Sequence, residues 1–180
     1  TVAILNNAGG GTLTGTLTKG ASGGEVTFSD LNIDKVGTGY TLRFTAAGLV
    51  QADSNPFNIT LGTPNKVVFV QQPTSAAAGA AIAPAVTAAI TDSKGNVITT
   101  SVATVTLAIG FNAGGGTLGG TPSRPAVAGV ATFNDLAIDK VGTAYTLTAS
   151  SAGLTSVTSS AFNVTPGAAT KLAFLQQPGN

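Results

Sequence analysis

The sequence contains no cysteine, histidine, methionine or tryptophan among its 180 residues. Without cysteine there are no disulfides, thiolate metal sites or cysteine nucleophiles. Without histidine the chain lacks the commonest general base and the commonest metal ligand. A catalytic serine or threonine would need another base held in a pocket, and the loops of this sequence are short. We therefore expect no enzymatic activity, no catalytic residues and no cofactor.

Charged side chains are also scarce. They make up 8% of the residues, against about 25% in typical globular proteins, and the net charge is +1. No basic face is available to neutralise nucleic-acid phosphates or to hold an anionic membrane. The uncharged stretch Val67–Thr91 contains Pro73 and Pro84, so we expect no transmembrane helix there. Thr1 leads directly into strand-like sequence, with no signal-peptide pattern before it.

An internal repeat dominates what the sequence does contain. KVGTGYTL at Lys35–Leu42 returns as KVGTAYTL at Lys140–Leu147, and KVVFVQQP from Lys66 returns as KLAFLQQP from Lys171. The shift is constant at 105 residues, and about 40 of the 75 residue pairs aligned without a gap are identical. We expect a stretch of a longer array that starts and stops inside repeats. The predicted domains are the later part of one repeat (1–65, about strands C to G), a complete repeat (66–170) and the first strand of a following repeat (171–180).

The repeat length and the residue pattern both favour β-structure. A period of 105 residues matches a β-sandwich domain of about 100 residues. No sustained i, i+3, i+4 apolar stripe is present, whereas alternation with a period of two recurs. We expect an all-β fold of tandem immunoglobulin-like antiparallel β-sandwiches, with about seven strands per repeat. The strands predicted for the complete repeat are Val67–Val70, Val86–Ile90, Val105–Ile109, Thr117–Leu118, Ala131–Phe133, Tyr145–Ala149 and a bent strand over Val157–Val164.

Two segments break this pattern of strands. The alanine-rich stretch Ser75–Ala85 is interrupted by Gly79 and Pro84, which favours an edge strand or a loop and leaves a short helical turn open. The segment Asp92–Asn96, with the sequence DSKGN, is typical of a turn that ends the preceding strand.

Several motifs together resemble a known class of repeats. They are K-L-x-F-x-x-Q-P, P-A-V-T, D-x-x-G-N, V-T-L-A-I, G-G-G-T-L, G-V-A-T-F-x-D-L-x-I-D-K, Y-T-L-T-A and F-N-V-T. The chain resembles the bacterial immunoglobulin-like (Big-type) tandem repeats of large extracellular surface proteins. This resemblance implies extracellular display at the cell surface or after secretion, often in the stalk of an adhesin, and no enzymatic activity in the repeat. In immunoglobulin-type domains a tyrosine hydroxyl bonds back to the chain, which the resemblance suggests for Tyr40 and Tyr145, although Thr38 and Thr143 stand where a smaller residue is often found.

A glycine-rich motif matches a nucleotide-binding pattern by its letters alone. Gly114, Gly116 and Gly119 have the G-x-G-x-x-G spacing of the dinucleotide fingerprint, which works only between a strand and the N-terminus of a helix. The next residues are Thr-Pro-Ser-Arg-Pro, which cannot start that helix, and the other copy has Thr14 in place of the third glycine. We predict a glycine-rich hairpin turn.

The recurring carboxylates have two interpretations. Calcium often rigidifies links between tandem domains, but it needs six to eight oxygen ligands. Each pair of aspartates here would need other elements to contribute. The alternative is that the carboxylates cap turns and form ion pairs. The residues concerned are Asp30, Asp34, Asp92, Asp135 and Asp139.

Two covalent modifications are also compatible with the sequence. Lys66 and Asn163 lie on the first and last strands of one repeat, as in domains joined by an isopeptide bond; the alternative is an exposed lysine and an outward asparagine. The segments Asn58–Thr60 and Asn163–Thr165 are N-glycosylation sequons. Alternation places the hydrophobic neighbours of Asn58 inward and its side chain in solvent.

These features lead to a structural hypothesis for function. We expect a spacer, stalk or filament whose partners are adjacent repeats or neighbouring copies of itself, joined by short linkers such as Thr165–Thr170. The segment Lys171–Pro178 has the sequence of a first strand and could be donated to the incomplete repeat of the next subunit. The alternative is an adhesin or carbohydrate-binding module, which predicts an exposed aromatic cluster in the loops.

Overall fold

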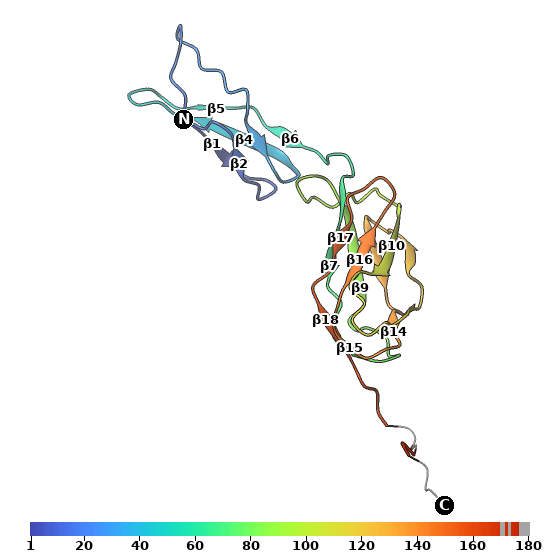
Figure 1. The fold of residues 1–180 in the computed structure, drawn as a ribbon. Coiled ribbons are helices and arrows are strands. Elements are labelled where there is room, and N and C mark those ends of the chain that lie inside the picture. The colour runs from blue at the N-terminus through green and yellow to red at the C-terminus, as the bar shows by residue number, and fades with distance from the viewer. Residues whose placement is uncertain (170–171, 173, 177–180) are drawn as a thin grey trace, which may run out of the picture. The chain divides into compact units, whose positions relative to one another are not determined.

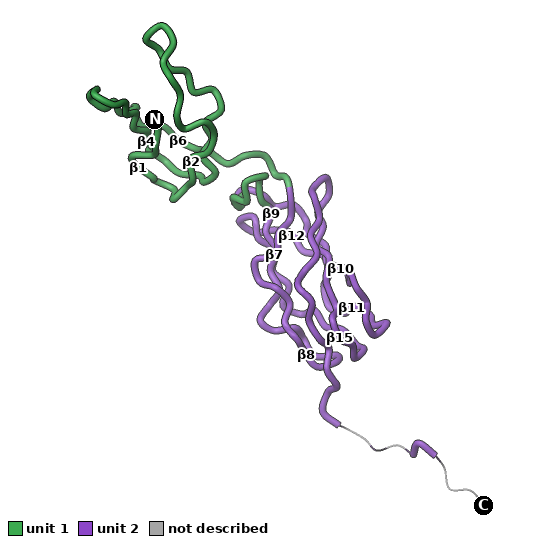
Figure 2. The backbone as a smooth tube through the Cα atoms, turned by 60° about the vertical axis from the view of Figure 1, so that its left-hand side comes forward, with its two compact units in different colours: residues 1–65, 91–98 green, residues 66–90, 99–180 purple. Residues whose placement is uncertain are grey.

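The computed structural model describes residues 1–169, 172 and 174–176. This described part is all-β and contains no helix, as the sequence predicts. It accordingly offers no helix of the length and apolarity needed to cross a membrane. The chain divides into two compact units (Figure 2). Unit 1 consists of Thr1–Asn65 and Thr91–Ile98, and unit 2 of Lys66–Ile90 and the described part of Thr99–Asn180.

Unit 1 is built from short antiparallel strands (Figure 1). The central strand β4 pairs with β1, β5 and β6, and β2 pairs with β3 in a separate ladder. The strands are β1 (Val2–Asn6), β2 (Leu13–Thr14), β3 (Asn32–Ile33), β4 (Gly37–Phe44), β5 (Ala52–Asp53) and β6 (Phe57–Ile59).

Unit 2 contains four small sheets, with strand orders β12-β10-β16-β17, β13-β9-β7, β15-β18-β8 and β11-β14. The ladder between β18 and β8 is parallel, whereas those of β10 with β12 and β16, of β11 with β14, of β13 with β9, of β15 with β18 and of β16 with β17 are antiparallel. The strands are β7 (Lys66–Gln71), β8 (Ala76–Ala77), β9 (Val86–Thr91), β10 (Thr104–Ile109), β11 (Leu118–Gly119), β12 (Ser123–Pro125), β13 (Val130–Phe133), β14 (Ala137–Ile138), β15 (Gly142–Tyr145), β16 (Leu147–Ser150), β17 (Val157–Thr158) and β18 (Phe162–Thr165).

The strand registers repeat along the chain with the period of the sequence. Val2 pairs with Phe44 in unit 1, and Leu107 with Ala149 in unit 2. The β2–β3 pairing recurs as β11–β14, the β4–β5 pairing as β16–β17, and the β4–β6 pairing as β15–β18, each 105 residues later. Two sequences that differ at nearly half of their positions thus form these four ladders in the same register, although β12 and β13 have no strand counterpart at 18–20 and 25–28.

Alternation along the strands places the core of unit 2. In β9, Val86, Ala88 and Ile90 are fully buried, and in β10 Val105 and Leu107 are buried while their neighbours are exposed. Because successive side chains of a strand point to opposite faces, this burial follows from the sequence pattern. The inward faces predicted for these two strands are buried, but Ala89 and Thr91 on the other face of β9 are buried as well, so alternation explains the burial in β10 and only part of the burial in β9.

Some predicted strands are interrupted. Tyr145–Ala149 is divided at Thr146, whose side-chain and main-chain oxygens accept the N–H groups of Phe111 and Gly110. The bent strand over Val157–Val164 is divided near Ser159, whose side chain accepts the N–H of Leu147 at 2.9 Å. Polar side chains that replace ladder hydrogen bonds thus produce more and shorter strands than the seven predicted.

The predictions for two loops have different outcomes. Ser75–Ala85 contains the edge strand β8 and no helical turn, so the edge-strand prediction is confirmed. The glycine-rich segment after β10 is not a hairpin turn, because β10 pairs with β12 and β16 whereas β11 pairs with β14. That segment connects strands of two different sheets.

Candidate functional site

The most elaborate polar arrangement in unit 2 surrounds Tyr145, which is fully buried. Its hydroxyl donates a hydrogen bond to the main-chain oxygen of Lys140 at 3.0 Å and accepts one from the N–H of Gly114 at 3.1 Å. Tyr40 of unit 1 donates in the same way to the oxygen of Lys35 at 3.0 Å. The back-bonding expected of both tyrosines is confirmed. The hydroxyl of Tyr145 thus holds the main chain at two points, Lys140 and Gly114.

The glycine-rich loop beside Tyr145 is closed by an asparagine. Asn112 donates from its side-chain nitrogen to the oxygen of Gly116 and accepts the N–H of Gly116 with its side-chain oxygen, both at 2.8 Å. Asn7 and Gly11 form the same two bonds in unit 1, also at 2.8 Å. We call residues 112–116, with Tyr145, the loop clamp. Its glycines allow close packing of the main chain. The segment that follows them is the strand β11 and not the helix N-terminus that binds phosphate in the dinucleotide fingerprint.

The aspartates around the loop clamp accept hydrogen bonds from distant parts of the chain. Asp139 accepts the N–H of Thr117 at 2.7 Å, and Asp135 accepts the hydroxyl of Thr121 at 2.7 Å. Arg124 forms an ion pair with Asp135 at 3.1 Å. In unit 1, Asp34 and Asp30 accept from Thr12 and Thr16 at the corresponding positions. These carboxylates hold a neighbouring strand rather than capping their own turn.

Asp92 is the exception, because it caps its own turn as predicted. Its side chain is only 4% exposed and accepts the N–H groups of Lys94 and Asn96, each at 2.9 Å. Burial raises the pKa of this carboxyl, but hydrogen bonds from Asn96, Gly62 and Lys94 outweigh burial and lower the pKa below its ordinary value.

The calcium interpretation of the aspartates receives no support from their arrangement. Within the described residues, no group of three or more carboxylates gathers where it could hold a metal ion. At least one oxygen of each of the five aspartates is engaged by a main-chain or side-chain donor. Each of these carboxylates thus caps a turn or bridges two segments of the chain.

Asp135 gives the clearest pH dependence. Hydrogen bonds from Thr121 and Arg124 lower its pKa from 3.8 to about 2. A lowered folded-state pKa stabilises the fold above pH 3.8, and this contribution is lost as the pH falls towards 2. We expect the melting temperature of Asp135→Asn to fall less steeply over that interval than that of the wild type. Thr121→Val, which removes the donor and keeps the carboxylate, should also flatten the curve. Parallel melting curves against pH for all three proteins would contradict this assignment.

The residues considered for covalent modification lie apart or have structural contacts. Lys66 lies on β7, which pairs with β9, whereas Asn163 lies on β18, which pairs with β15 and β8. The first and last strands approach each other, but Asn163 donates its N–H to Ser75, beyond the end of β7, whereas Lys66 at the start of β7 bridges Thr155, so the two residues are not opposite each other as an isopeptide bond requires. The side-chain oxygen of Asn163 accepts the N–H of Ala144 at 3.0 Å, and Asn58 accepts that of Gly39 at 3.0 Å.

The orientation predicted for the two sequons is confirmed. Asn58 and Asn163 are exposed, while their hydrophobic neighbours Phe57, Phe162 and Val164 are half-buried or buried. What the sequence did not reveal is that both asparagines hold a residue with positive φ, 87° at Gly39 and 69° at Ala144. An asparagine that recurs 105 residues later, opposite such a residue, is the signal that would have pointed to this contact.

Comparison with known proteins gives only distant structural similarity. No protein-family pattern matches the chain, and no curated protein matches it. Among solved structures, a β-glycosidase from Bacteroides vulgatus matches with a TM-score of 0.47 and 16% identity, over 78% of this chain and 19% of that one. A glycosyl hydrolase family 2 member from Bacteroides cellulosilyticus matches with a TM-score of 0.45 and 16% identity, over 73% and 18%. The chain spans about a fifth of the length of these enzymes.

Proposed function

We propose that this chain is a non-enzymatic structural segment of an extracellular array of immunoglobulin-like β-sandwich repeats. The observation that supports this most strongly is the recurrence of the same contacts at a distance of 105 residues. The tyrosine bond, the asparagine closure of the glycine loop and the aspartate bridge each appear twice with nearly the same lengths. Every one of these contacts fixes the main chain, which is what a spacer requires.

The sheet arrangement of unit 2 supports the immunoglobulin-like part of the proposal. The sheet β13-β9-β7 and the sheet β12-β10-β16-β17 each contribute fully buried side chains, as the two inner faces of a sandwich do. The parallel pairing of β8 with β18 adds an early strand to the edge of a later one. On this proposal each repeat buries its own core and is joined to the next by a short linker.

The proposed location is the cell surface, and the proposed partners are adjacent repeats or further copies of the chain. Strand donation between subunits is one way to build a filament from such repeats. Half of the proposed donor, Lys171–Pro178, lies outside the described residues. The scarcity of charge, at 8% of residues, favours lateral association of such surfaces because little repulsion opposes it.

Immunogold labelling of intact producing cells, with antibodies raised against residues 1–180, tests this proposal. We expect label along extended material at the cell surface, and negative-stain images that show a beaded stalk or an ordered filament. Pre-incubating the antibody with purified chain is the control and should remove the label. Label confined to the cell interior would contradict the proposal.

A further inference from the structure

The turn at the end of β9 belongs to the complete repeat by its sequence and to unit 1 by its contacts. The complete repeat begins at Lys66, yet the segment Thr91–Ile98 forms one compact unit with Thr1–Asn65. Figure 2 draws this segment in the green of unit 1. A piece of one repeat is therefore part of the folded body of the repeat before it.

Hydrogen bonds join this turn to two segments of residues 1–65. The side-chain nitrogen of Asn96 donates to the main-chain oxygen of Asp34 at 2.9 Å, a residue 62 positions earlier in the sequence. The N–H of Gly62 donates to the carboxylate of Asp92 at 3.3 Å. Asp34 follows β3, which pairs with β2, and Gly62 follows β6, which pairs with β4. The turn thus contacts the ends of two separate ladders of unit 1.

The two side chains of the turn that reach these segments also hold each other. The same side-chain nitrogen of Asn96 donates to one carboxylate oxygen of Asp92 at 3.0 Å. The other carboxylate oxygen accepts the N–H groups of Lys94 and Asn96. A turn of this kind needs only the bonds that it makes within itself. The bonds from Asn96 to Asp34 and from Gly62 to Asp92 reach beyond the turn, so they serve the contact with residues 1–65 rather than the reversal of the chain.

Gly62 allows the linker after β6 to approach the turn closely. A β-carbon at this position would lie 3.2 Å from the β-carbon of Asp92 and 3.3 Å from a carboxylate oxygen, which is closer than side chains usually pack. Between the linkers 60–65 and 165–170, only the threonine at the first position and the glycine at the third are identical. The pocket beside the turn, of about 340 Å³, is lined mainly by polar side chains. The contact therefore depends largely on hydrogen bonds and on this close approach.

We propose that the turn Asp92–Asn96 is the coupling element through which a repeat stabilises the repeat before it. Its partner is the surface formed by residues 32–34 and 58–62, which recognises the pattern D-x-x-G-N by the side chains of its first and last residues. In repeat proteins, stability depends on such interactions between nearest neighbours. This inference deepens the proposed array by naming the contact that couples consecutive repeats, and it rests on that proposed function.

The test is native-state hydrogen exchange of the chain of residues 1–180, read at the amides of β4 and β6 in unit 1 and of β15 and β18 in unit 2. Asn96→Ala should speed exchange in β4 and β6 about fivefold, the effect of losing one hydrogen bond, and change β15 and β18 less. Gly62→Val should act in the same direction, because its side chain displaces the turn. Ser93→Ala is the matched control, since this side chain is exposed in the same turn, and should leave both units unchanged. The double variant Asn96→Ala with Gly62→Val should exceed the larger single effect by less than about twofold, because both substitutions remove one contact.

Three results would overturn the proposal. Unchanged exchange of β4 and β6 in Asn96→Ala would mean that the side chain serves only its own turn. Equal effects of Asn96→Ala and Ser93→Ala would mean that the bond to Asp34 does not stabilise unit 1. Effects that multiply in the double variant would mean that Gly62 acts on its own loop and not through the turn. Surface labelling is measured separately on cells, so the proposed function can fail while the coupling is still observed, and the coupling can fail while the label remains at the surface.

Discussion

Gly114→Ala is expected to destabilise unit 2 by about 2–6 kcal/mol. A β-carbon at this position would lie 2.1 Å from the main-chain oxygen of Val141 and 2.5 Å from the hydroxyl oxygen of Tyr145. The first neighbour is main chain and cannot rotate away, so the loop must move. Overpacking of this kind costs about 1–3 kcal/mol, and the loss of the buried tyrosine hydrogen bonds adds about 1–3 kcal/mol.

Gly119→Ala is the matched control for this variant. It lies in the same glycine-rich segment, and the nearest atom to its added β-carbon is the oxygen of Ala137 at 3.8 Å, an ordinary contact distance. We expect a change of less than about 1 kcal/mol. Hydrogen exchange of the β15 and β16 amides, compared with those of unit 1, would assign the loss to unit 2. Equal effects of the two substitutions would show that the close approach at Gly114 does not determine stability.

Alternation, turn residues and the repeat were enough to predict much of this fold. Val86, Ala88 and Ile90 alternate in sequence and are buried together in the structure, because the two-residue period of a strand is a local property. The turn at Asp92 was predictable for the same reason, since its partners Lys94 and Asn96 follow within four residues.

Contacts between distant segments were not predictable in this way. Asp139 accepts the N–H of Thr117, which lies 22 residues away in the sequence. The residues next to Asp139 do not show which N–H its carboxylate will accept. Whether Lys66 lies opposite Asn163 depends on the register of the two segments, and the structure places Ser75 opposite Asn163 and Thr155 opposite Lys66. The break at Ser159 depends on a hydrogen bond to Leu147 on the neighbouring strand. The sequence repeat gives Phe28 and Phe133 the same position, but only the structure shows that their exposure differs.

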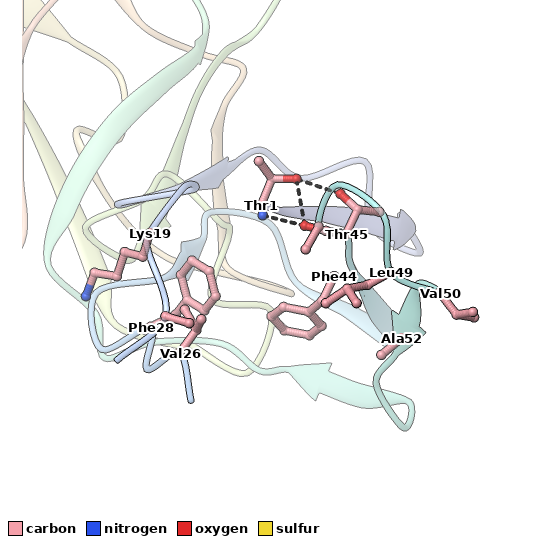
Figure 3. Close-up of a pocket in the computed structure, with 11 residues that line it drawn as sticks. Thr1, Lys19, Val26, Phe28, Phe44, Thr45, Leu49, Val50 and Ala52 are labelled. Carbon is pink, nitrogen blue, oxygen red and sulfur yellow. Dashed lines mark hydrogen bonds between the residues drawn. The ribbon is translucent and has the colours of Figure 1, made fainter. Parts of the chain in front are cut away.

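Phe133→Ala and Phe28→Ala should have unequal effects, although the two phenylalanines occupy the same position of the repeat. Phe133 is fully buried, and its truncation is expected to cost about 3–5 kcal/mol. Phe28 is half-buried and contacts Phe44, with ring centroids 5.8 Å apart (Figure 3). Its truncation should cost about 1–2 kcal/mol, because part of the ring already lies in water and the aromatic pair contributes about 0.5–1.5 kcal/mol. Chemical denaturation of each variant, monitored by hydrogen exchange of the amides of each unit, measures both values.

The unequal exposure of the two phenylalanines is what this pair of variants tests, because the residue type and the position in the repeat are the same. Equal costs would contradict the expectation and would show that the ring of Phe28 contributes as much to stability as the ring of Phe133.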